Sequence, residues 1–250
     1  ALQCDREGFY AYFSIGYAYG SLSLTNGQVD NTQLYQRAIQ YFLKAISLIE
    51  TVPHHQKYYS FYLSVIHTNI AWMEKRLDQN TEALVYYQRA IDANPRHLRA
   101  YFSRAILHRS MNLRELALKD YSSCIQIFED QYKTLSESGD VNSVNIVKKR
   151  MASILEDRGL TNMDTANESD EAKRDFTRAI ELCPKEAPFA YLILSFLYTD
   201  TENGYRGALK VLEDGVRECC ENPGMTNDPQ CYKDMARLLS FKADVLLAIN

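Results

Sequence analysis

The histidines and cysteines of this 250-residue chain are its first candidates for catalysis or metal binding, and their spacing favours neither. His54 and His55 adjoin in a turn after Pro53, and no two histidines stand four residues apart, as zinc ligands on one helix would. The cysteines form no Cys-x-x-Cys pair, and the sequence contains neither a glycine-rich phosphate loop nor a G-x-S-x-G motif. We therefore predict no enzymatic activity, no cofactor and no bound metal.

Asn69, Trp72 and Arg99 offer a different chemistry, the binding of a polypeptide. An asparagine amide can hydrogen-bond to a peptide backbone, and a guanidinium can hold a carboxylate through two parallel hydrogen bonds. Trp72 is the only tryptophan, a residue type used both for packing between helices and as an anchor in binding sites. Whether these three side chains can act together depends on the elements that carry them.

One pattern recurs five times along the chain: a small residue, three others, a large apolar residue, two others, and a second small residue. The occurrences are Ala38/Phe42/Ala45, Ala83/Tyr87/Ala90, Ala117/Tyr121/Cys124, Ala172/Phe176/Ala179 and Ala208/Leu212/Gly215. Steps of four and three residues put the members of each triplet on one face of a helix. Small residues let a neighbouring helix approach closely, so the pattern predicts repeated pairs of tightly packed helices.

The sequence around two of the triplets also repeats, since the segments Gln88–Pro95 and Thr177–Pro184 are nearly identical. In both segments a proline follows five residues after the second small residue. This ending resembles the second helix of the tetratricopeptide repeat. The second small residues Ala90 and Cys124 are 34 residues apart, the length of that repeat. Other intervals are longer, and we expect loops at Thr25–Asp30, Ser136–Asp140, Thr161–Ser169 and Glu221–Pro229.

The resemblance implies an all-α fold, a right-handed superhelical solenoid of about five helix pairs followed by a closing helix. We expect one domain over residues 1–250, and the first residue is not Met, so we also expect a longer parent chain. The expected repeat units are approximately 8–50, 56–95, 97–135, 142–184 and 187–220, with the closing helix at 229–249.

In this family the first helix of each pair lines a concave groove, which implies a set of candidate partner-binding residues here. They are Asn69, Trp72, Arg76, Arg99, Phe102, Ser103 and Arg109. We predict a non-enzymatic scaffold that binds a partner protein in this groove or on the convex face, within a multi-protein assembly. No small-molecule substrate is expected.

Two alternatives remain open at this point. Repeats of this family that dock the acidic C-terminal tails of chaperones use two asparagines and three basic residues, a carboxylate clamp. Asn69 and Arg99 match two of these five positions, whereas Ser103 stands where the next basic residue belongs. The other alternative is a helical-repeat RNA-binding module, which the net charge of −4 and the apolar groove positions disfavour.

The start of the chain, the positions of the cysteines and the length of the apolar runs together predict the cellular compartment. Without a signal peptide at the start, and with cysteines at small buried helix positions, we expect a reducing compartment, the cytoplasm. The apolar runs are shorter than the roughly 20 residues that a membrane-spanning helix needs, so no membrane span is expected.

Overall fold

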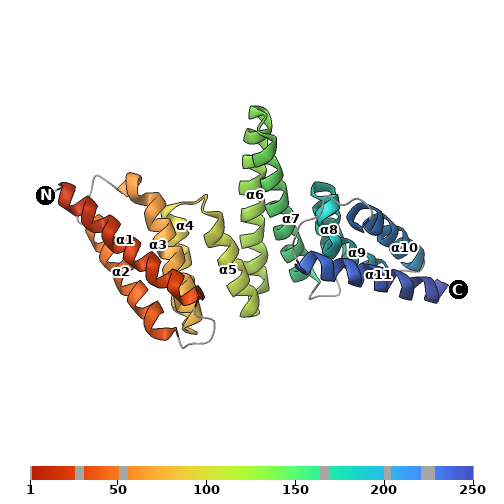
Figure 1. The fold of residues 1–250 in the computed structure, drawn as a ribbon, viewed down its shortest axis with the longest axis horizontal. Helices are drawn as coiled ribbons and strands as arrows, with labels where there is room; N and C mark the ends of the chain where they lie inside the picture. The colour runs from red at the N-terminus through yellow and green to blue at the C-terminus, as the bar shows by residue number, and fades with distance from the viewer. Residues whose placement is uncertain are drawn as a thin grey trace. The chain divides into compact units, whose positions relative to one another are not determined.

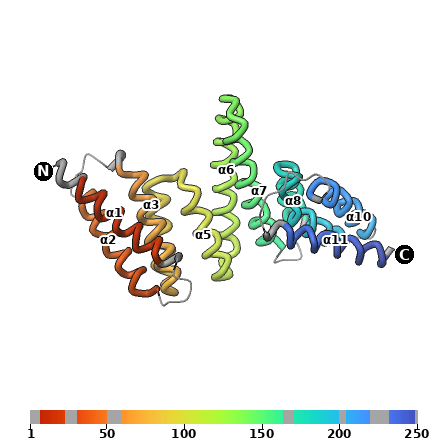
Figure 2. The backbone as a smooth tube through the Cα atoms, in the orientation of Figure 1, coloured from red at the N-terminus to blue at the C-terminus, as the bar shows by residue number. Residues whose placement is uncertain are grey.

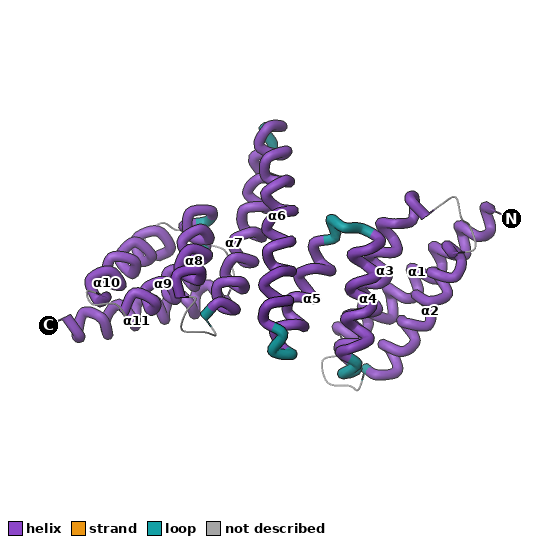
Figure 3. Tube along the Cα trace, turned by 180° about the vertical axis from the view of Figure 1, so that it is seen from behind, coloured by secondary structure: helices purple, strands orange, loops and turns teal. Residues whose placement is uncertain are grey.

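The computed structural model describes residues 2–25, 31–50, 56–163, 169–199, 204–220 and 229–249. Within these ranges the chain is helical except for short turns, and it contains no β-strand (Figure 3). The predicted all-α class is confirmed. The chain divides into two compact units, residues 1–113 and 114–250, and each is considered by itself (Figure 2).

The helices of the N-terminal unit are α1 (Leu2–Thr25), α2 (Thr32–Glu50), α3 (Gln56–Arg76), α4 (Asn80–Ala93) and α5 (Leu98–Ser110). Those of the C-terminal unit are α6 (Arg114–Ser138), α7 (Val141–Asn162), α8 (Ser169–Leu182), α9 (Pro188–Thr199), α10 (Gly204–Gly215) and α11 (Pro229–Ile249). A 3₁₀ turn at Pro184–Glu186 precedes α9, and a π-helical turn at Val216–Cys220 follows α10.

Consecutive helices pack as neighbours within each unit (Figure 1). In the N-terminal unit α1 packs against α2 and α3 against α4, while α2 also contacts α3 and α4 contacts α5. In the C-terminal unit α7 contacts both α6 and α8, α9 packs against α10, and α11 lies against both α9 and α10. The repeat unit expected at 97–135 would join α5 to α6 across the two units, so this repeat and the single superhelix stay predictions.

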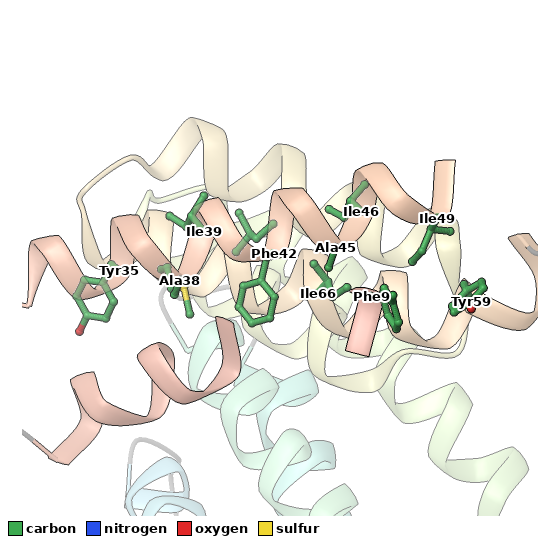
Figure 4. Close-up of a cluster of buried hydrophobic side chains, with 12 residues drawn as sticks. Phe9, Tyr35, Ala38, Ile39, Phe42, Ala45, Ile46, Ile49, Tyr59 and Ile66 are labelled. Atoms are coloured by element: carbon green, nitrogen blue, oxygen red, sulfur yellow. The ribbon is translucent and has the colours of Figure 1, made fainter. Parts of the chain in front are cut away.

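All fifteen residues of the five triplets are buried, which confirms the assignment of the packing faces. In α2, Ala38, Phe42 and Ala45 are each 0% exposed, and they follow one another along the helix in Figure 4, where Phe9 of α1 lies toward the Ala45 end. A Cβ atom added to Gly16 of α1 would lie 2.9 Å from the Phe42 ring. The large residue of the triplet therefore fills the gap between two helices that approach closely.

The turns that end α3 and α5 have the same geometry. Asp78 and Asn112 adopt left-handed backbone conformations, with φ of 59° and 58°, which Asn and Asp tolerate better than most residues. The N–H groups of Gln79 and Leu113 donate to the carbonyls of Glu74 and His108, an end that satisfies carbonyls left over by the last turn. This pair of turns repeats the 34-residue period in the backbone itself.

The expectation of a loop at Ser136–Asp140 was wrong. α6 continues to Ser138, and the connection to α7 is limited to Gly139, with φ of 75°, and Asp140, whose side chain accepts a hydrogen bond from the Ser143 N–H at 3.1 Å. The extra residues lengthen α6 and α7 instead. α7 also continues through Thr161 to Asn162, whereas 164–168 lies outside the described residues. The loops expected at Thr25–Asp30 and Glu221–Pro229 lie there too, apart from Thr25 and Pro229, which belong to helices.

Replacing Ala90 by leucine is expected to lower the free energy of unfolding by about 1–3 kcal/mol, because the larger side chain overpacks a closed helix crossing. Ala90 is 0% exposed and belongs to the same triplet as Tyr87, which is 1% exposed. Urea unfolding followed by circular dichroism measures the loss. Val85→Leu on the exposed side of the same helix is the control, and equal stability of both variants would contradict the assigned packing face.

Candidate functional site

A pocket of about 200 Å³ in the N-terminal unit collects side chains from four helices. Its lining residues are Tyr17, Gly20 and Ser21 of α1, Phe42 of α2, Asn69, Trp72 and Met73 of α3, and Arg99 of α5. The structure therefore brings three of the seven predicted residues, Asn69, Trp72 and Arg99, to one pocket. Because all four helices belong to residues 1–113, the pocket lies within one compact unit.

Asn69 is the polar group at the inner end of this site. It lies in the middle of α3 and is 8% exposed, and its amide nitrogen is buried without a hydrogen-bond partner. An unsatisfied buried donor typically costs about 1–3 kcal/mol. Among the described residues, the fold leaves this donor without an acceptor.

Arg99 supplies the positive charge of the pocket. It lies in the first turn of α5 and is exposed, and among the described residues it makes no ion pair. Its neighbour His97 is placed by a 3.0 Å contact between its Nδ1 and the Ser64 hydroxyl. Burial, together with the positive charge of Arg99, lowers the pKa of His97, so this histidine adds no charge near neutral pH. The guanidinium is therefore available to an anionic group of a ligand.

Trp72 takes part in helix packing and also lines the pocket, whereas its role as a binding anchor stays a prediction. One part of its indole packs edge-on against Tyr35 of α2, with ring centroids 5.7 Å apart, and the half-buried ring also lines the pocket. The Arg76 guanidinium lies over the same indole, 5.5 Å from its centre. Arg76 itself lines a different, more open depression of about 570 Å³ between α2 and the α3–α4 turn.

The other three predicted residues do not line the pocket. Phe102 and Ser103 are partly buried in α5, and Ser103 hydrogen-bonds with the buried Tyr87 hydroxyl, which gives it a packing role. Arg109 is exposed near the end of α5. A part for these residues in partner binding stays a prediction.

Helix α1 contributes pocket residues that were not predicted from the sequence. A Cβ atom on Gly20 would lie 2.7 Å from the Met73 methyl group, so this glycine lets α1 approach α3 closely beside the pocket. Tyr17, 55% exposed, precedes it on the same face. The spacing of Gly16 and Gly20, one helical turn apart, was the signal in the sequence for this close approach.

Metal and membrane chemistry find no support in the part of the chain that is described. There, no group of three or more histidine, cysteine or acidic side chains could hold a metal ion. No helix in those ranges is long and apolar enough to cross a bilayer. Cys124 and Cys219 are buried and Cys183 is half-buried, and no disulfide joins them. A cytoplasmic location stays a prediction.

Burial shifts the pKa values of two ionisable groups outside the pocket, lowering that of His67 and raising that of Glu156. Burial, and to a lesser degree the charge of Arg89, lowers the pKa of His67 in the N-terminal unit to about 4. The contribution of His67 to stability is present at pH values above its ordinary pKa of 6.5, and it is lost as the pH falls toward 4. Burial, followed by the charges of Asp157 and Asp234, raises the pKa of Glu156 in the C-terminal unit to about 7.

Replacing Glu156 by glutamine is expected to stabilise the chain at pH 8 and to change little at pH 4.5. Because the folded pKa lies above the ordinary 4.5, the contribution of Glu156 is present below 4.5 and is lost as the pH rises through 7. The glutamine oxygen still accepts a hydrogen bond from the Ala190 N–H. We expect a gain of about 1–2 kcal/mol, less than the full shift since the side chain is partly solvated. Thermal melts at both pH values test this, and an equal effect at both would contradict it.

Comparison with known proteins identifies one repeat, which carries part of the pocket lining. Residues 65–97 match the tetratricopeptide repeat family, a segment that contains Asn69 and Trp72. A stretch of 62 residues, 25% of this chain, is 39% identical to the UDP-N-acetylglucosamine–peptide N-acetylglucosaminyltransferase of Giardia intestinalis. That stretch is 4% of the length of the transferase.

Solved structures share the fold at low sequence identity. MamA has a TM-score of 0.58 at 14% identity, over 89% of this chain and 99% of MamA. A tetratricopeptide repeat protein from Parabacteroides merdae has a TM-score of 0.57 at 17% identity, and the match covers 96% of this chain and 77% of that protein. PilF of Pseudomonas aeruginosa has a TM-score of 0.56 at 15% identity, and the match covers 98% of this chain and 89% of PilF. These likenesses establish the helical repeat architecture and nothing finer.

Proposed function

This chain carries a tetratricopeptide repeat and has the fold of proteins built from that repeat, and we propose that it is a non-catalytic scaffold that binds a segment of a partner protein in the pocket of its N-terminal unit. The observation that carries the proposal is the buried amide nitrogen of Asn69, which has no hydrogen-bond partner among the residues that the structure describes. A ligand that supplies an acceptor recovers the energy that this donor loses on folding.

The chemistry of the pocket selects an extended peptide segment with an anionic group. The Asn69 amide donates to a backbone carbonyl of the peptide, while the Arg99 guanidinium donates two hydrogen bonds to a carboxylate. A volume of about 200 Å³ accommodates a single side chain of the ligand beside Phe42 and Met73. Trp72 and Tyr17 supply the aromatic contact area that such sites use as anchors.

The carboxylate has two sources, an acidic side chain within the partner or the partner's own C-terminus. If the carboxylate is the partner's C-terminus, the pocket would dock an acidic chaperone tail through a partial carboxylate clamp. Asn69 and Arg99 share the pocket, which is compatible with either source. We favour an internal segment, because Ser103 stands at the next clamp position and hydrogen-bonds with Tyr87.

Two displayed peptide libraries test the proposal, one with free C-termini and one with internal sequences. Each is selected on the 250-residue chain and counter-selected on an Asn69→Leu variant. We expect enrichment of acidic sequences from the internal library that are not retained by the variant. Enrichment from the C-terminal library alone would assign the tail-docking function instead. Sequences retained equally by both proteins would show that binding occurs elsewhere on the chain.

A further inference from the structure

Helix α11 (Pro229–Ile249) presents a second apolar face beside the one that packs on α9 and α10. Its buried face is formed by Asp234, Met235, Leu238 and Val245. The exposed apolar residues next to this face are Tyr232 (46%), Ala236, Leu239 (49%), Ala243, Leu246 (40%) and Leu247 (77%). We call these six residues the outer stripe.

The outer stripe makes α11 more apolar than one packing contact requires. A surface helix of a globular domain needs an apolar arc of about 100° to cover its core. With 3.6 residues per turn, the buried face and the outer stripe together span roughly two thirds of the circumference of α11. Exposed polar residues are confined to the remaining strip, which contains Lys233, Arg237, Ser240 and Asp244.

The spacing of the outer stripe is that of a helix-packing face. Tyr232, Ala236, Leu239, Ala243 and Leu246 follow one another in steps of four and three residues, the spacing of a helix–helix seam. Taken from the C-terminal side, Ala243, Leu239 and Ala236 repeat the small–large–small triplet that is buried at five other places in this chain. The geometry therefore fits an α-helix as occupant, because small residues on either side of a large one admit a close helix.

Charge beside the stripe decides what kind of helix fits. Lys233 is exposed at one edge and Lys242 is partly exposed at the other. Arg237, in the polar strip, pairs with Asp234 at 3.1 Å. Lysines on both edges favour a partner with acidic residues flanking its apolar seam, as complementary charges beside a coiled-coil seam set partner choice.

We propose that the outer stripe of α11 is a docking site for one amphipathic helix of a partner protein, with glutamate or aspartate beside its apolar seam. This site is independent of the pocket at Asn69. Its ligand is helical rather than extended, and it lies in the other compact unit.

Fluorescence anisotropy with two designed peptides tests the proposal on the 250-residue chain. Both peptides have three heptads with alternating leucine and alanine along the seam, and they carry either glutamate or lysine at the flanking positions. We expect the glutamate peptide to bind about tenfold or more tightly than the lysine peptide, with an affinity that falls as salt rises. Leu239→Glu should reduce its affinity at least about tenfold, since it places a charge in the seam.

A charge exchange provides the sharper arm. The double variant Lys233→Glu/Lys242→Glu should reverse the preference and favour the lysine peptide. Val85→Glu, at an exposed apolar residue of the other unit, is the control that leaves binding unchanged. Circular dichroism confirms that each variant is folded. Equal binding of the two peptides, or binding insensitive to Leu239→Glu, would overturn the proposal.

Two further experiments test whether the stripe binds a second copy of this chain or a lipid surface instead. Sedimentation velocity of the chain alone should show no dimer that Leu239→Glu dissociates, because such a dimer would assign the stripe to a second copy of this chain. Vesicles of phosphatidylcholine and phosphatidylglycerol should not bind the chain through Leu239. Binding to vesicles that is abolished by Leu239→Glu would replace the helix by a lipid surface.

Discussion

Replacing Asp175 by alanine is expected to lower the free energy of unfolding by about 3–5 kcal/mol, the range for removing one partner of a buried ion pair. Asp175 lies in α8 and is 4% exposed. Its carboxylate accepts two hydrogen bonds from Arg158 of α7, with Nε–Oδ2 and Nη2–Oδ1 distances of 2.9 and 2.5 Å. Among the described residues, the variant leaves the guanidinium of Arg158, whose side chain is 23% exposed, with only the Ser122 hydroxyl, 3.1 Å away, as a hydrogen-bond partner.

Neighbouring hydrogen bonds extend this ion pair into a polar network. The Asn162 amide also donates to Asp175, at 3.4 Å, and the Thr161 carbonyl accepts from Arg114 of α6, at 2.8 Å. These contacts join α6, α7 and α8, so the loss of Asp175 should expose amide protons in all three helices. Urea unfolding measures the total effect, and hydrogen–deuterium exchange shows which helices lose protection.

Asp170→Ala on the same helix is the matched control. The Asp170 side chain is 87% exposed, and its contact with Lys173 is 3.8 Å, so we expect a change below about 1 kcal/mol. Removing both charges, in Arg158→Met/Asp175→Leu, should cost less than Asp175→Ala alone, because no buried charge is left without a partner. If Asp175→Ala unfolds like the unmodified chain, the ion pair is not a structural element of this unit.

Replacing Asn69 and Arg99 together is expected to weaken binding of a selected peptide by about 2–4 kcal/mol, since a neutral hydrogen bond from Asn69 contributes about 0.5–1.5 kcal/mol and hydrogen bonding of Arg99 to a carboxylate about 1.5–3 kcal/mol. In the variant Asn69→Leu/Arg99→Ala the pocket loses its unpaired donor and its guanidinium. The corresponding fall in affinity is between roughly thirtyfold and a thousandfold. Isothermal titration calorimetry with an enriched peptide measures it.

Stability separates a binding role from a structural one. The Asn69 amide nitrogen has no partner, so exchange for leucine of similar size should leave the melting temperature unchanged or raise it. A large loss of stability in Asn69→Leu would show that the side chain supports the fold. Arg109→Ala, on the same helix as Arg99 but outside the pocket, is the control for charge. Equal losses in affinity for Arg99→Ala and Arg109→Ala would extend the site along α5.

Much of the fold could be predicted because the information for it is local. The triplet Ala83/Tyr87/Ala90 lies within three helical turns, and its spacing alone defines which side of α4 is buried. The same holds for the other four triplets. The exception at Ser136–Asp140 has a physical cause as well, since serine and glutamate near a glycine are compatible with both a loop and a helix end. The exposed residues Ser136–Ser138 continue α6, which ends before Gly139, where φ is 75°, and Asp140 caps α7.

The sequence by itself therefore determined the helices and their buried faces, because helical periodicity acts over a few residues, whereas the candidates Asn69 and Arg99 came from the resemblance to the tetratricopeptide repeat. Which side chains meet depended on the tertiary structure. Asn69 and Arg99 share a pocket because α5 packs beside α3, and Gly20 admits α1 to the same place. Arg158 and Asp175 pair only because α7 and α8 are antiparallel neighbours. Convergence of distant residues is set by how helices cross, and no local pattern contains that information.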